Sequence, residues 1–217
     1  MAVISRLHYI TQGLPNFSHA QLAEFACKGG ADWVQLRVKS KPFDEWLKIA
    51  LEVKLVCLKY NAKLIINDNV QIAKEAEADG VHLGKGDMNP KEARKILGNN
   101  FIIGGSTNTM EDVRRKMTEG CDYIGLGPFR HTTTKEKLSP VLGIEGMKNI
   151  ADKFWSKIPI IAIGGIKLED IESLIKAGIY GVAVSSGINM AEDKSGMTRK
   201  FITSLRGIPF RDDEAIS

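Results

Sequence analysis

The most regular feature of the chain is an alternation between short apolar runs and longer stretches whose apolar residues recur at helical spacing. Several short runs are apolar at almost every position, among them LIIN at 64–67, IPIIAI at 158–163 and GVAV at 181–184. Such runs are typical of strands buried on both faces of a parallel sheet. The pattern predicts eight strands, at residues 7–11, 33–37, 63–67, 80–83, 101–104, 123–126, 160–163 and 181–184.

The stretches between these strands predict amphipathic helices. The clearest are residues 45–59, 110–119, 142–155 and 168–177, which place apolar residues three and four positions apart. Polar residues that favour helix starts precede two of the helical stretches, so we expect Ser18 to cap the first helix and Asp44 the second.

One short phrase recurs before four of the strands. A small residue ends a helix, a turn follows, and a strand enters the core, as in GADWV at 30–34 and GCDYI at 120–124. Repetition of this kind describes an α/β repeat, and eight uninterrupted units favour a closed barrel over an open sheet. We therefore predict α/β architecture with a single (β/α)₈ TIM barrel as the catalytic domain over residues 1–208, followed by a polar tail at 209–217.

Composition narrows the class of protein. The chain has 217 residues, 43% of them hydrophobic and 26% charged, which is ordinary for a globular protein. Its formal net charge of +4 comes from scattered lysines, so we expect solvated helix faces and no nucleic-acid partner. No signal peptide or membrane span is evident, and Cys27, Cys57 and Cys121 lack metal or CxxC spacing, so we expect free thiols, a cytoplasmic location and no membrane partner. Whether the chain forms a homo-oligomer stays open.

Polar residues at the end of the second predicted strand share one face. Gln35, Arg37 and Lys39 are two positions apart, so strand periodicity turns all three the same way. Two cations buried without an anion would be costly, which favours a clamp for an anion and a heterocycle at the barrel mouth. A solvent-facing edge, or an ion-paired layer inside the barrel, is the alternative.

Two carboxylates follow the next two strands. Asp68 comes directly after the third strand, and Asp87 follows the fourth in GKGD at 84–87. The ends of neighbouring strands lie close together, and two carboxylates with substrate phosphate oxygens are a common way to hold Mg²⁺. Either aspartate alone could instead cap the following helix.

The loop after the sixth strand is long and polar. Three threonines at 132–134 and Lys135 suit a phosphate group, and a loop of this length in a compact barrel is usually functional. His131 could act in acid–base chemistry or be incidental. By contrast, His8 and His82 lie within predicted strands, where we expect them to pack or hydrogen-bond inside the barrel.

Glycines and serines follow the last strands. Gly164-Gly165 follows the seventh strand and Ser185-Ser186 the eighth, the place where barrels of this class commonly bind phosphate. Ser106, in GGST after the fifth strand, offers a hydroxyl but could equally be a helix cap.

In order along the chain, the motifs QLRVK, LIINDN, DGVHLGKGD, GGST, DYIGLGPF…TTTK, IAIGGI and GVAVSS resemble the thiamine-phosphate synthase family. The resemblance covers the chain from Tyr9 to about Ile188. It implies a transferase that condenses 4-amino-2-methyl-5-(diphosphooxymethyl)pyrimidine with a thiazole phosphate, giving thiamine phosphate and diphosphate. It also implies a dissociative reaction, in which the C–O bond to diphosphate breaks first and leaves a pyrimidine carbocation.

The resemblance further implies roles for individual residues, all toward small-molecule substrates. The pyrimidine diphosphate would contact Gln35, Arg37, Lys39, Asn67, Ser106 and Lys135, of which Arg37, Lys39, Ser106 and Lys135 would be catalytic through charge and hydrogen bonds. The thiazole phosphate would bind Thr132, Thr134, Gly165, Ser185 and Ser186. Asp68 and Asp87 would hold Mg²⁺.

Some positions depart from the family pattern. Val38 stands where Glu is common, and we expect its side chain to point away from the site. Lys85 stands where Gln is common, and Arg130-His131 precede the threonines in a loop that usually reads Phe-Pro-Thr-x-Thr-Lys. Lys85, Arg130 and His131 could therefore alter how the loop closes or which thiazole phosphate the protein prefers.

Two other functions compete with this interpretation. A thiazole tautomerase on a related barrel would keep the thiazole-phosphate site and could use His131, but it needs neither metal nor diphosphate. A non-catalytic regulator that binds thiazole phosphate would be expected to lack the metal carboxylates. Asp68 and Asp87 argue against both.

Overall fold

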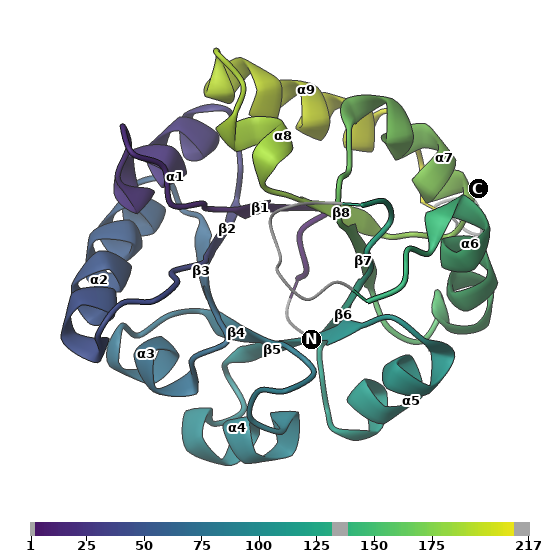
Figure 1. Cartoon of the computed structure of the whole chain (residues 1–217), viewed down its shortest axis with the longest axis horizontal. Coiled ribbons are helices and arrows are strands. Elements are labelled where there is room, and N and C mark those ends of the chain that lie inside the picture. The colour runs from purple at the N-terminus through teal and green to yellow at the C-terminus, as the bar shows by residue number, and fades with distance from the viewer. Residues whose placement is uncertain (1–2, 132–138, 211–217) are drawn as a thin grey trace.

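Eight parallel strands form a closed barrel in the computed structural model, which describes residues 3–131 and 139–210. Neighbours in the barrel are neighbours in the chain, and the last strand pairs with the first, where His8 lies beside Ala183 (Figure 1). The strands are β1 Leu7–Ile10, β2 Trp33–Leu36, β3 Lys63–Asn67, β4 Gly80–Leu83, β5 Ile102–Thr107, β6 Tyr123–Leu126, β7 Ile160–Ile163 and β8 Gly181–Val184. The predicted (β/α)₈ barrel is confirmed.

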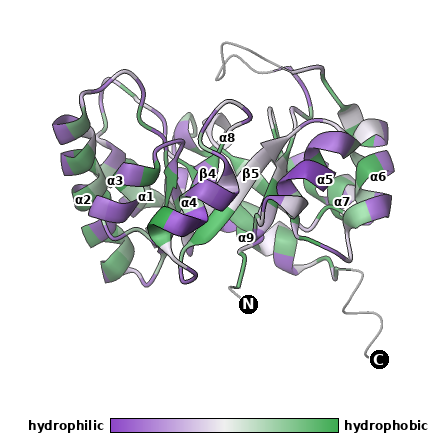
Figure 2. Cartoon of the chain, turned by 90° about the horizontal axis from the view of Figure 1, so that it is seen from below, coloured by the Kyte–Doolittle hydropathy of each residue, from purple (hydrophilic) through white to green (hydrophobic). Residues whose placement is uncertain are grey.

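A ring of helices surrounds the barrel, as Figure 1 shows. In the side view of Figure 2, α2 and α3 lie to one side of β4 and β5, while α5, α6 and α7 lie to the other. The helices are α1 His19–Lys28, α2 Phe43–Lys59, α3 Val70–Glu75, α4 Pro90–Leu97, α5 Met110–Thr118, α6 Gly143–Phe154, α7 Ile171–Lys176, α8 Ser186–Asn189 and α9 Lys194–Arg206, with a short 3₁₀ turn, η1, at Leu168–Asp170.

The core has two parts because successive strand residues face opposite sides of the sheet. On β2, Val34 and Leu36 pack outward into a large cluster between strands and helices. Trp33 turns inward, into a smaller cluster that fills the barrel interior below the mouth and includes Ile65, Ile102 and Tyr123. This alternation turns Gln35 inward above Trp33, and so sets which residues reach the barrel mouth.

Helix starts agree with the sequence in one case and differ in another. Ser18 caps α1 through a capping box, in which its hydroxyl accepts from the Gln21 N–H and the Gln21 side chain accepts from the Ser18 N–H. The prediction for Asp44 is wrong. Pro42 occupies the cap of α2, and Asp44 lies inside the first turn, where its charge still stabilises the helix dipole.

Two further boundaries differ from the predicted ones. The fifth strand extends to Thr107, so Ser106 is a strand residue and does not cap a helix; Thr109 caps α5 instead. The predicted helix at 168–177 divides into η1 and α7. Strand pairing decided the first difference, because Ser106 lies beside Gly125 of β6 and continues the ladder.

Three other expectations concern the chain as a whole. Cys27, Cys57 and Cys121 are free and buried, as predicted. Within residues 3–131 and 139–210, no helix combines the length and apolar character that a membrane crossing requires. Phe210 is buried and packs edge-on against Tyr180, 5.3 Å between ring centres. The division at residue 208 stays a prediction, since residues 211–217 lie outside the described chain.

Candidate active site

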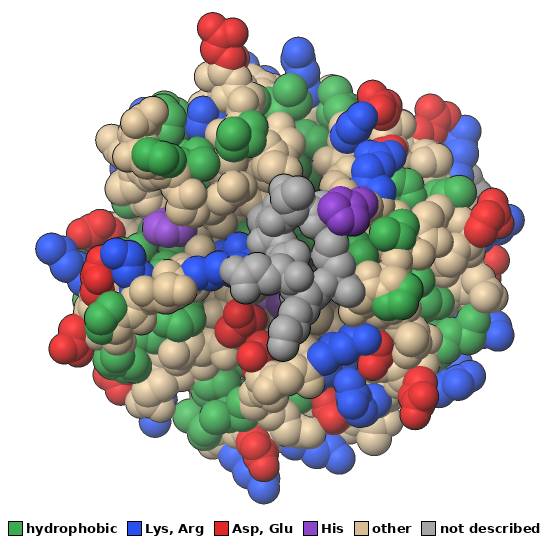
Figure 3. All heavy atoms as spheres, in the orientation of Figure 1, with side chains coloured by type: hydrophobic (Ala, Val, Ile, Leu, Met, Phe, Trp, Pro, Cys, Tyr) green, Lys and Arg blue, Asp and Glu red, His purple; other side chains and the backbone are tan. Residues whose placement is uncertain are grey.

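A cavity of about 520 Å³ opens at the C-terminal ends of the strands. Figure 3 shows acidic and basic side chains side by side near the centre of this face. Of the residues predicted for the site, the following line the cavity: Gln35, Arg37, Asn67, Asp68, Asp87, Ser106, Gly165, Ser185 and Ser186. Lys39 is exposed beyond β2 and is not part of the lining, so its role stays a prediction. Thr132, Thr134 and Lys135 lie outside the described residues.

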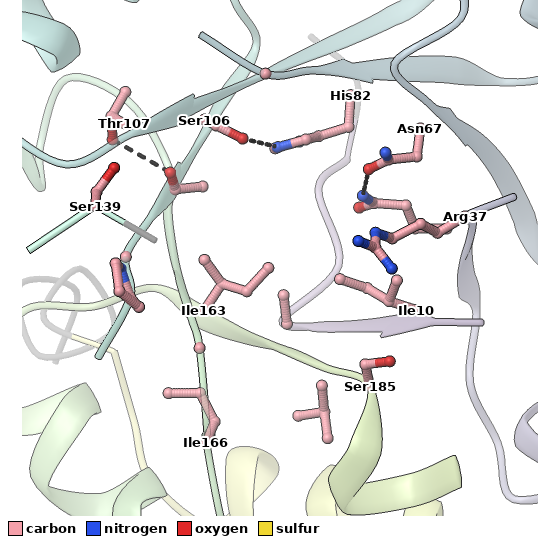
Figure 4. A pocket seen from close by; sticks show the side chains of 18 of the residues that line it. Ile10, Arg37, Asn67, His82, Ser106, Thr107, Ser139, Ile163, Ile166 and Ser185 are labelled. Atoms are coloured by element: carbon pink, nitrogen blue, oxygen red, sulfur yellow. Dashed lines mark hydrogen bonds between the residues drawn. The ribbon is translucent and has the colours of Figure 1, made fainter. Parts of the chain in front are cut away.

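The ends of β2 and β3 form a polar wall. The Gln35 amide donates to the Asn67 side-chain oxygen at 2.7 Å, so the two amides hold each other in place. Arg37, half buried, lies beside them and faces the cavity in Figure 4. This wall combines amide groups that can recognise a heterocycle with a cation that can bind an anion.

Thr11 fixes the position of Arg37. Its hydroxyl accepts from the Arg37 N–H at 3.1 Å and contacts His19 Nδ1 at 2.8 Å, and Thr11 itself is fully buried. Burial lowers the pKa of His19, which favours the neutral ring in this contact. Sequence patterns pointed to neither Thr11 nor His19, because the contact joins the ends of β1 and β2 to α1 and no local motif encodes it.

The two predicted metal ligands flank one backbone position. A Cβ on Gly84 would lie 2.8 Å from Asp87 Oδ2 and 3.9 Å from Asp68 Oδ1, so both carboxylates approach the same point. Asp87 Oδ2 also accepts from the Gly84 N–H at 2.6 Å. Asp68 has a left-handed backbone, with φ of 67°, a conformation that aspartate tolerates and that often marks functional sites.

This pair fits a hard cation that shares its coordination with a substrate. Mg²⁺ prefers oxygen ligands and usually keeps several waters or phosphate oxygens beside one or two carboxylates. Among the described residues there is no cluster of three or more His, Cys, Asp or Glu side chains that could enclose a metal. The donor set therefore suits Mg²⁺ carried with a diphosphate better than a permanently bound transition metal.

Lys85, one of the departures from the family pattern, forms an ion pair across the rim. Its ammonium lies 2.5 Å from Asp112 Oδ2 at the start of α5. Burial on its own raises the pKa of Asp112, but hydrogen bonds from Lys85 and from the Asn108 backbone outweigh it and hold the pKa below its usual value. The pair joins the β4 loop to α5, so part of the Lys85 charge is already neutralised.

A chain of hydrogen bonds runs from the cavity into the barrel interior. His82 Nε2 contacts Ser106 Oγ at 2.9 Å (Figure 4), and His82 Nδ1 contacts the Tyr123 hydroxyl at 3.0 Å. The prediction that His82 and His8 pack within the barrel is confirmed, since His8 stacks on Trp33 with ring centres 4.1 Å apart. The contact with Ser106 gives His82 a further role, which is to orient a hydroxyl that faces the cavity.

Across the cavity, a buried asparagine organises the end of β8. Asn189 donates to the Ile10 carbonyl at 2.9 Å and to Ser185 Oγ at 3.2 Å, while its oxygen accepts from the Tyr9 hydroxyl at 2.5 Å. Ser185 therefore has a defined orientation toward the mouth. Nothing in the sequence pointed to Asn189 or Tyr9, because the two lie 180 positions apart.

The base of the loop after β6 is tied at both ends. The Asn108 amide donates to the carbonyls of Gly127 and Pro140, each at 2.9 Å. Two backbone bonds extend the tie, from the Leu142 N–H to the Pro128 carbonyl and from the Gly143 N–H to the Phe129 carbonyl. Residues 127–129 and 140–143, on the two sides of the loop, are therefore held next to each other.

The cavity is divided by chemical character. Arg37, Asp68, Asp87 and Ser106 lie toward β2 to β5, whereas Gly165, Ile166 and Ser185 lie toward β7 and β8. In Figure 4, Ile163 lies between Ser106 and Ser185. Val38 packs in the outer core, as predicted. The arrangement can hold an anion with a metal on one side and a smaller anion on the other, with an apolar surface between them.

Comparisons with known proteins agree with this geometry. The profile of the family described as thiamine monophosphate synthase matches residues 7–188. A thiamine-phosphate synthase from Flavobacterium psychrophilum is 49% identical over 192 residues, which cover 87% of this chain and 93% of the relative. One from Bacteroides thetaiotaomicron is 44% identical over 203 residues, covering 92% and 97%. The solved structure of a thiamine phosphate pyrophosphorylase from Pyrococcus furiosus superposes with a TM-score of 0.84 at 31% identity, covering 93% of this chain and 96% of that one.

Proposed function

This chain belongs to the thiamine monophosphate synthase family, and from that premise we propose how its barrel mouth carries out the reaction. The enzyme is a transferase that condenses 4-amino-2-methyl-5-(diphosphooxymethyl)pyrimidine with a thiazole phosphate. A bond forms between the thiazole nitrogen and the pyrimidine methylene carbon, and the C–O bond to diphosphate breaks. The products are thiamine phosphate and diphosphate, and no proton has to be removed.

The observation that carries the proposal is the pair of carboxylates beside Arg37 in one cavity. Asp68 and Asp87 would hold Mg²⁺, which when bound neutralises charge on the leaving diphosphate. Arg37 binds the diphosphate from the β2 side, and Ser106, oriented by His82, donates a hydrogen bond to it. Lys39 and Lys135 supply further positive charge.

The remaining lining residues position the two substrates. Gln35 and Asn67, paired through their amides, bind the aminopyrimidine ring, while Gly165, Ser185 and Ser186 bind the thiazole phosphate together with Thr132 and Thr134. Ile163 and Ile166 keep water away from the carbocation until the thiazole nitrogen reaches it. Holding both substrates in one cavity makes the capture effectively intramolecular.

Neither competing function uses the full set of groups. A thiazole tautomerase or a non-catalytic regulator would need the β7 and β8 side of the cavity but not the carboxylates toward β3 and β4. We further propose the cytoplasm as the compartment, because Cys27, Cys57 and Cys121 are buried and form no disulfide with one another.

The experiment that tests the proposal is a product assay. The purified full chain is incubated with both substrates, and thiamine phosphate is measured with Mg²⁺ and with a chelator. We expect product only with the metal, and a rate lowered on the order of 100-fold by Asp68→Ala and by Asp87→Ala. Asp44→Ala, which removes a carboxylate in the first turn of α2, is the matched control and should leave the rate unchanged.

Each outcome has a defined meaning. Absence of product with the wild-type chain would refute the transferase assignment. Product formation that is indifferent to the chelator would refute the metal, and wild-type rates in both aspartate variants would refute the two ligands. Circular dichroism of the variants confirms that the barrel is folded.

A further inference from the structure

Arg130 lies in the described residues that follow β6, and its side chain bonds both a carboxylate and a backbone carbonyl. Its guanidinium donates from Nη1 to Asp170 Oδ2 and from Nη2 to Asp170 Oδ1, each at 2.7 Å, and from Nη1 to the Gly165 carbonyl at 2.8 Å. Asp170 is almost fully buried. The fork is therefore bidentate toward the carboxylate and also holds the glycine turn that follows β7.

Three successive carbonyls of that turn face the same segment. The Phe129 N–H donates to the Ile163 carbonyl at 2.8 Å, and the Arg130 N–H donates to the Gly164 carbonyl at 3.0 Å. The Arg130 guanidinium donates to the third carbonyl, that of Gly165. In an ordinary strand successive carbonyls alternate in direction. Here they do not, because Gly164 and Gly165 have positive φ values of 101° and 68°.

The direction of the carbonyls fixes the direction of the amides. A trans peptide is planar, so its N–H points opposite to its C=O. The N–H groups of Gly164, Gly165 and Ile166 consequently all turn away from residues 129 and 130. Successive amides that point one way form a concave site with positive character, which suits an anion. All three residues line the cavity.

The positive charge of Arg130 is neutralised by its ion pair with Asp170. Both carboxylate oxygens accept from the guanidinium, and the hydrogen bond with Asp170 raises the pKa of Arg130 above its usual value. A guanidinium held in this way stabilises the backbone around it more than it attracts a further anion. Its side chain also packs directly against the Cα of Gly165, where a Cβ would clash with Arg130 Cγ.

We propose that Arg130 is a positioning residue, which with Asp170 holds the amides of residues 164–166 in the orientation that binds the thiazole phosphate. The inference rests on the proposed function, because that function assigns the thiazole phosphate to Gly165. It adds a residue that touches neither substrate and that acts on one of the two only. It also gives a structural meaning to a position where this chain departs from the family pattern.

The test separates the two substrates kinetically. For Arg130→Met, KM for the thiazole phosphate should rise about tenfold, the effect of losing one hydrogen bond to a charged group. KM for the pyrimidine diphosphate should stay within about twofold of wild type, because the β2 to β5 side of the cavity is unchanged. Asp170→Asn should act in the same direction, and Arg130→Lys should fall between, since an ammonium cannot make the bidentate contact.

Arg94→Met is the matched control. Arg94 also joins a carboxylate, Asp122 at 2.7 Å, to backbone carbonyls, those of Gly98 and Phe101, but it lies on α4 and outside the cavity lining. Its loss should lower the melting temperature and leave both KM values unchanged. A purely structural role for Arg130 would give the same result as Arg94.

The outcomes distinguish this inference from the function on which it rests. If wild type makes no thiamine phosphate, the function fails, and the binding of thiazole phosphate to wild type and Arg130→Met by calorimetry still decides the inference. If wild type is active, equal changes in both KM values, or no change in either, would overturn it. Should Arg130→Met not fold, Arg130→Lys supplies the same comparison.

Discussion

Single side chains at the barrel mouth derive their function from partners that the sequence does not place beside them. Ser106 followed two glycines and could be interpreted as a helix cap or a phosphate ligand. In the folded chain it lies on β5 with its hydroxyl against His82, whose second nitrogen meets Tyr123. Burial raises the pKa of the Tyr123 hydroxyl well above its usual value, so it stays protonated and can donate to His82.

Two substitutions of His82 test whether it orients Ser106. A glutamine amide nitrogen reaches approximately the position of histidine Nε2, whereas that of asparagine reaches the position of Nδ1. His82→Asn should therefore lose the Ser106 contact and lower kcat/KM for the pyrimidine diphosphate about tenfold, the equivalent of one hydrogen bond. His82→Gln should retain most of the activity. Steady-state kinetics with saturating thiazole phosphate measure both.

The comparison with Ser106→Ala completes this test. If His82 acts through Ser106, the double variant Ser106→Ala, His82→Asn should be no slower than Ser106→Ala alone. Additive losses, or equal effects of Asn and Gln, would show that His82 contributes through packing and not through the hydroxyl.

Strands and helices meet at the mouth through a small number of buried polar ties. Asn108, which follows β5, bonds the first and last parts of the loop between β6 and α6. Its own N–H donates to Asp112, the same carboxylate that pairs with Lys85. One asparagine thus links three βα units, and its side chain is only 5% exposed.

Replacing Asn108 should weaken the barrel measurably. Asn108→Ala leaves two carbonyls without their donor, which costs about 1–3 kcal/mol of unfolding free energy and lowers the melting temperature by about 2–4 °C per kcal/mol. Asn108→Asp should be at least as destabilising, because a carboxylate cannot donate to a carbonyl. Scanning calorimetry measures both variants.

Asn100→Ala provides the control for this prediction. Asn100 is exposed in the turn before β5, so its removal should leave the melting temperature nearly unchanged. A melting temperature of Asn108→Asp equal to that of wild type would show that the donated hydrogen bonds contribute little.

The interior of the barrel makes the stability of the molecule depend on pH. His8 is fully buried against Trp33 and Tyr123, and no hydrogen bond of ordinary geometry reaches either of its nitrogens among the described residues. Burial, and secondly the nearby His82, lower the pKa of His8 well below its usual value, with a weak opposing effect from the Ser5 backbone. The folded chain therefore carries His8 as the neutral ring.

The sign of the pH effect follows from proton binding. An unfolded histidine takes up a proton near pH 6.5, whereas His8 in the folded chain does not. Above about pH 8 neither state is protonated at this ring, so it contributes no pH dependence there. As the pH falls below about 6.5, the unfolded state binds more protons and the free energy of unfolding falls, by up to about 1.4 kcal/mol per pH unit.

His8→Phe tests this effect because it keeps an aromatic ring and removes the titrating nitrogens. Urea denaturation from about pH 7.5 to 5 should show a smaller decrease in unfolding free energy for the variant than for wild type. His131 is exposed, and the control variant His131→Ala should show the same decrease in unfolding free energy with pH as wild type. An undiminished slope in His8→Phe would contradict the assignment, whatever its effect on stability at neutral pH.

The apolar runs and their spacing were enough to predict the barrel and the end of it that holds the site. Continuous apolar strands have to be covered on both faces, and eight of them with helices between can satisfy this by closing on themselves. Strand periodicity likewise brought Gln35, Arg37, Asp68 and Asp87 to one mouth, because residues that follow parallel strands come out at the same end. These features are local or repeat along the chain, so the sequence by itself determined them.

The contacts that orient these groups were decided only by the tertiary structure. Thr11 behind Arg37, Tyr9 behind Asn189 and Asp170 behind Arg130 are pairs that the closed barrel brings together from separate βα units. A hydrogen bond between residues 40 or 180 positions apart has no periodicity that a pattern could reveal. Burial makes such partners necessary, since a polar group removed from water needs one, but which residue supplies it depends on the packing of the whole barrel.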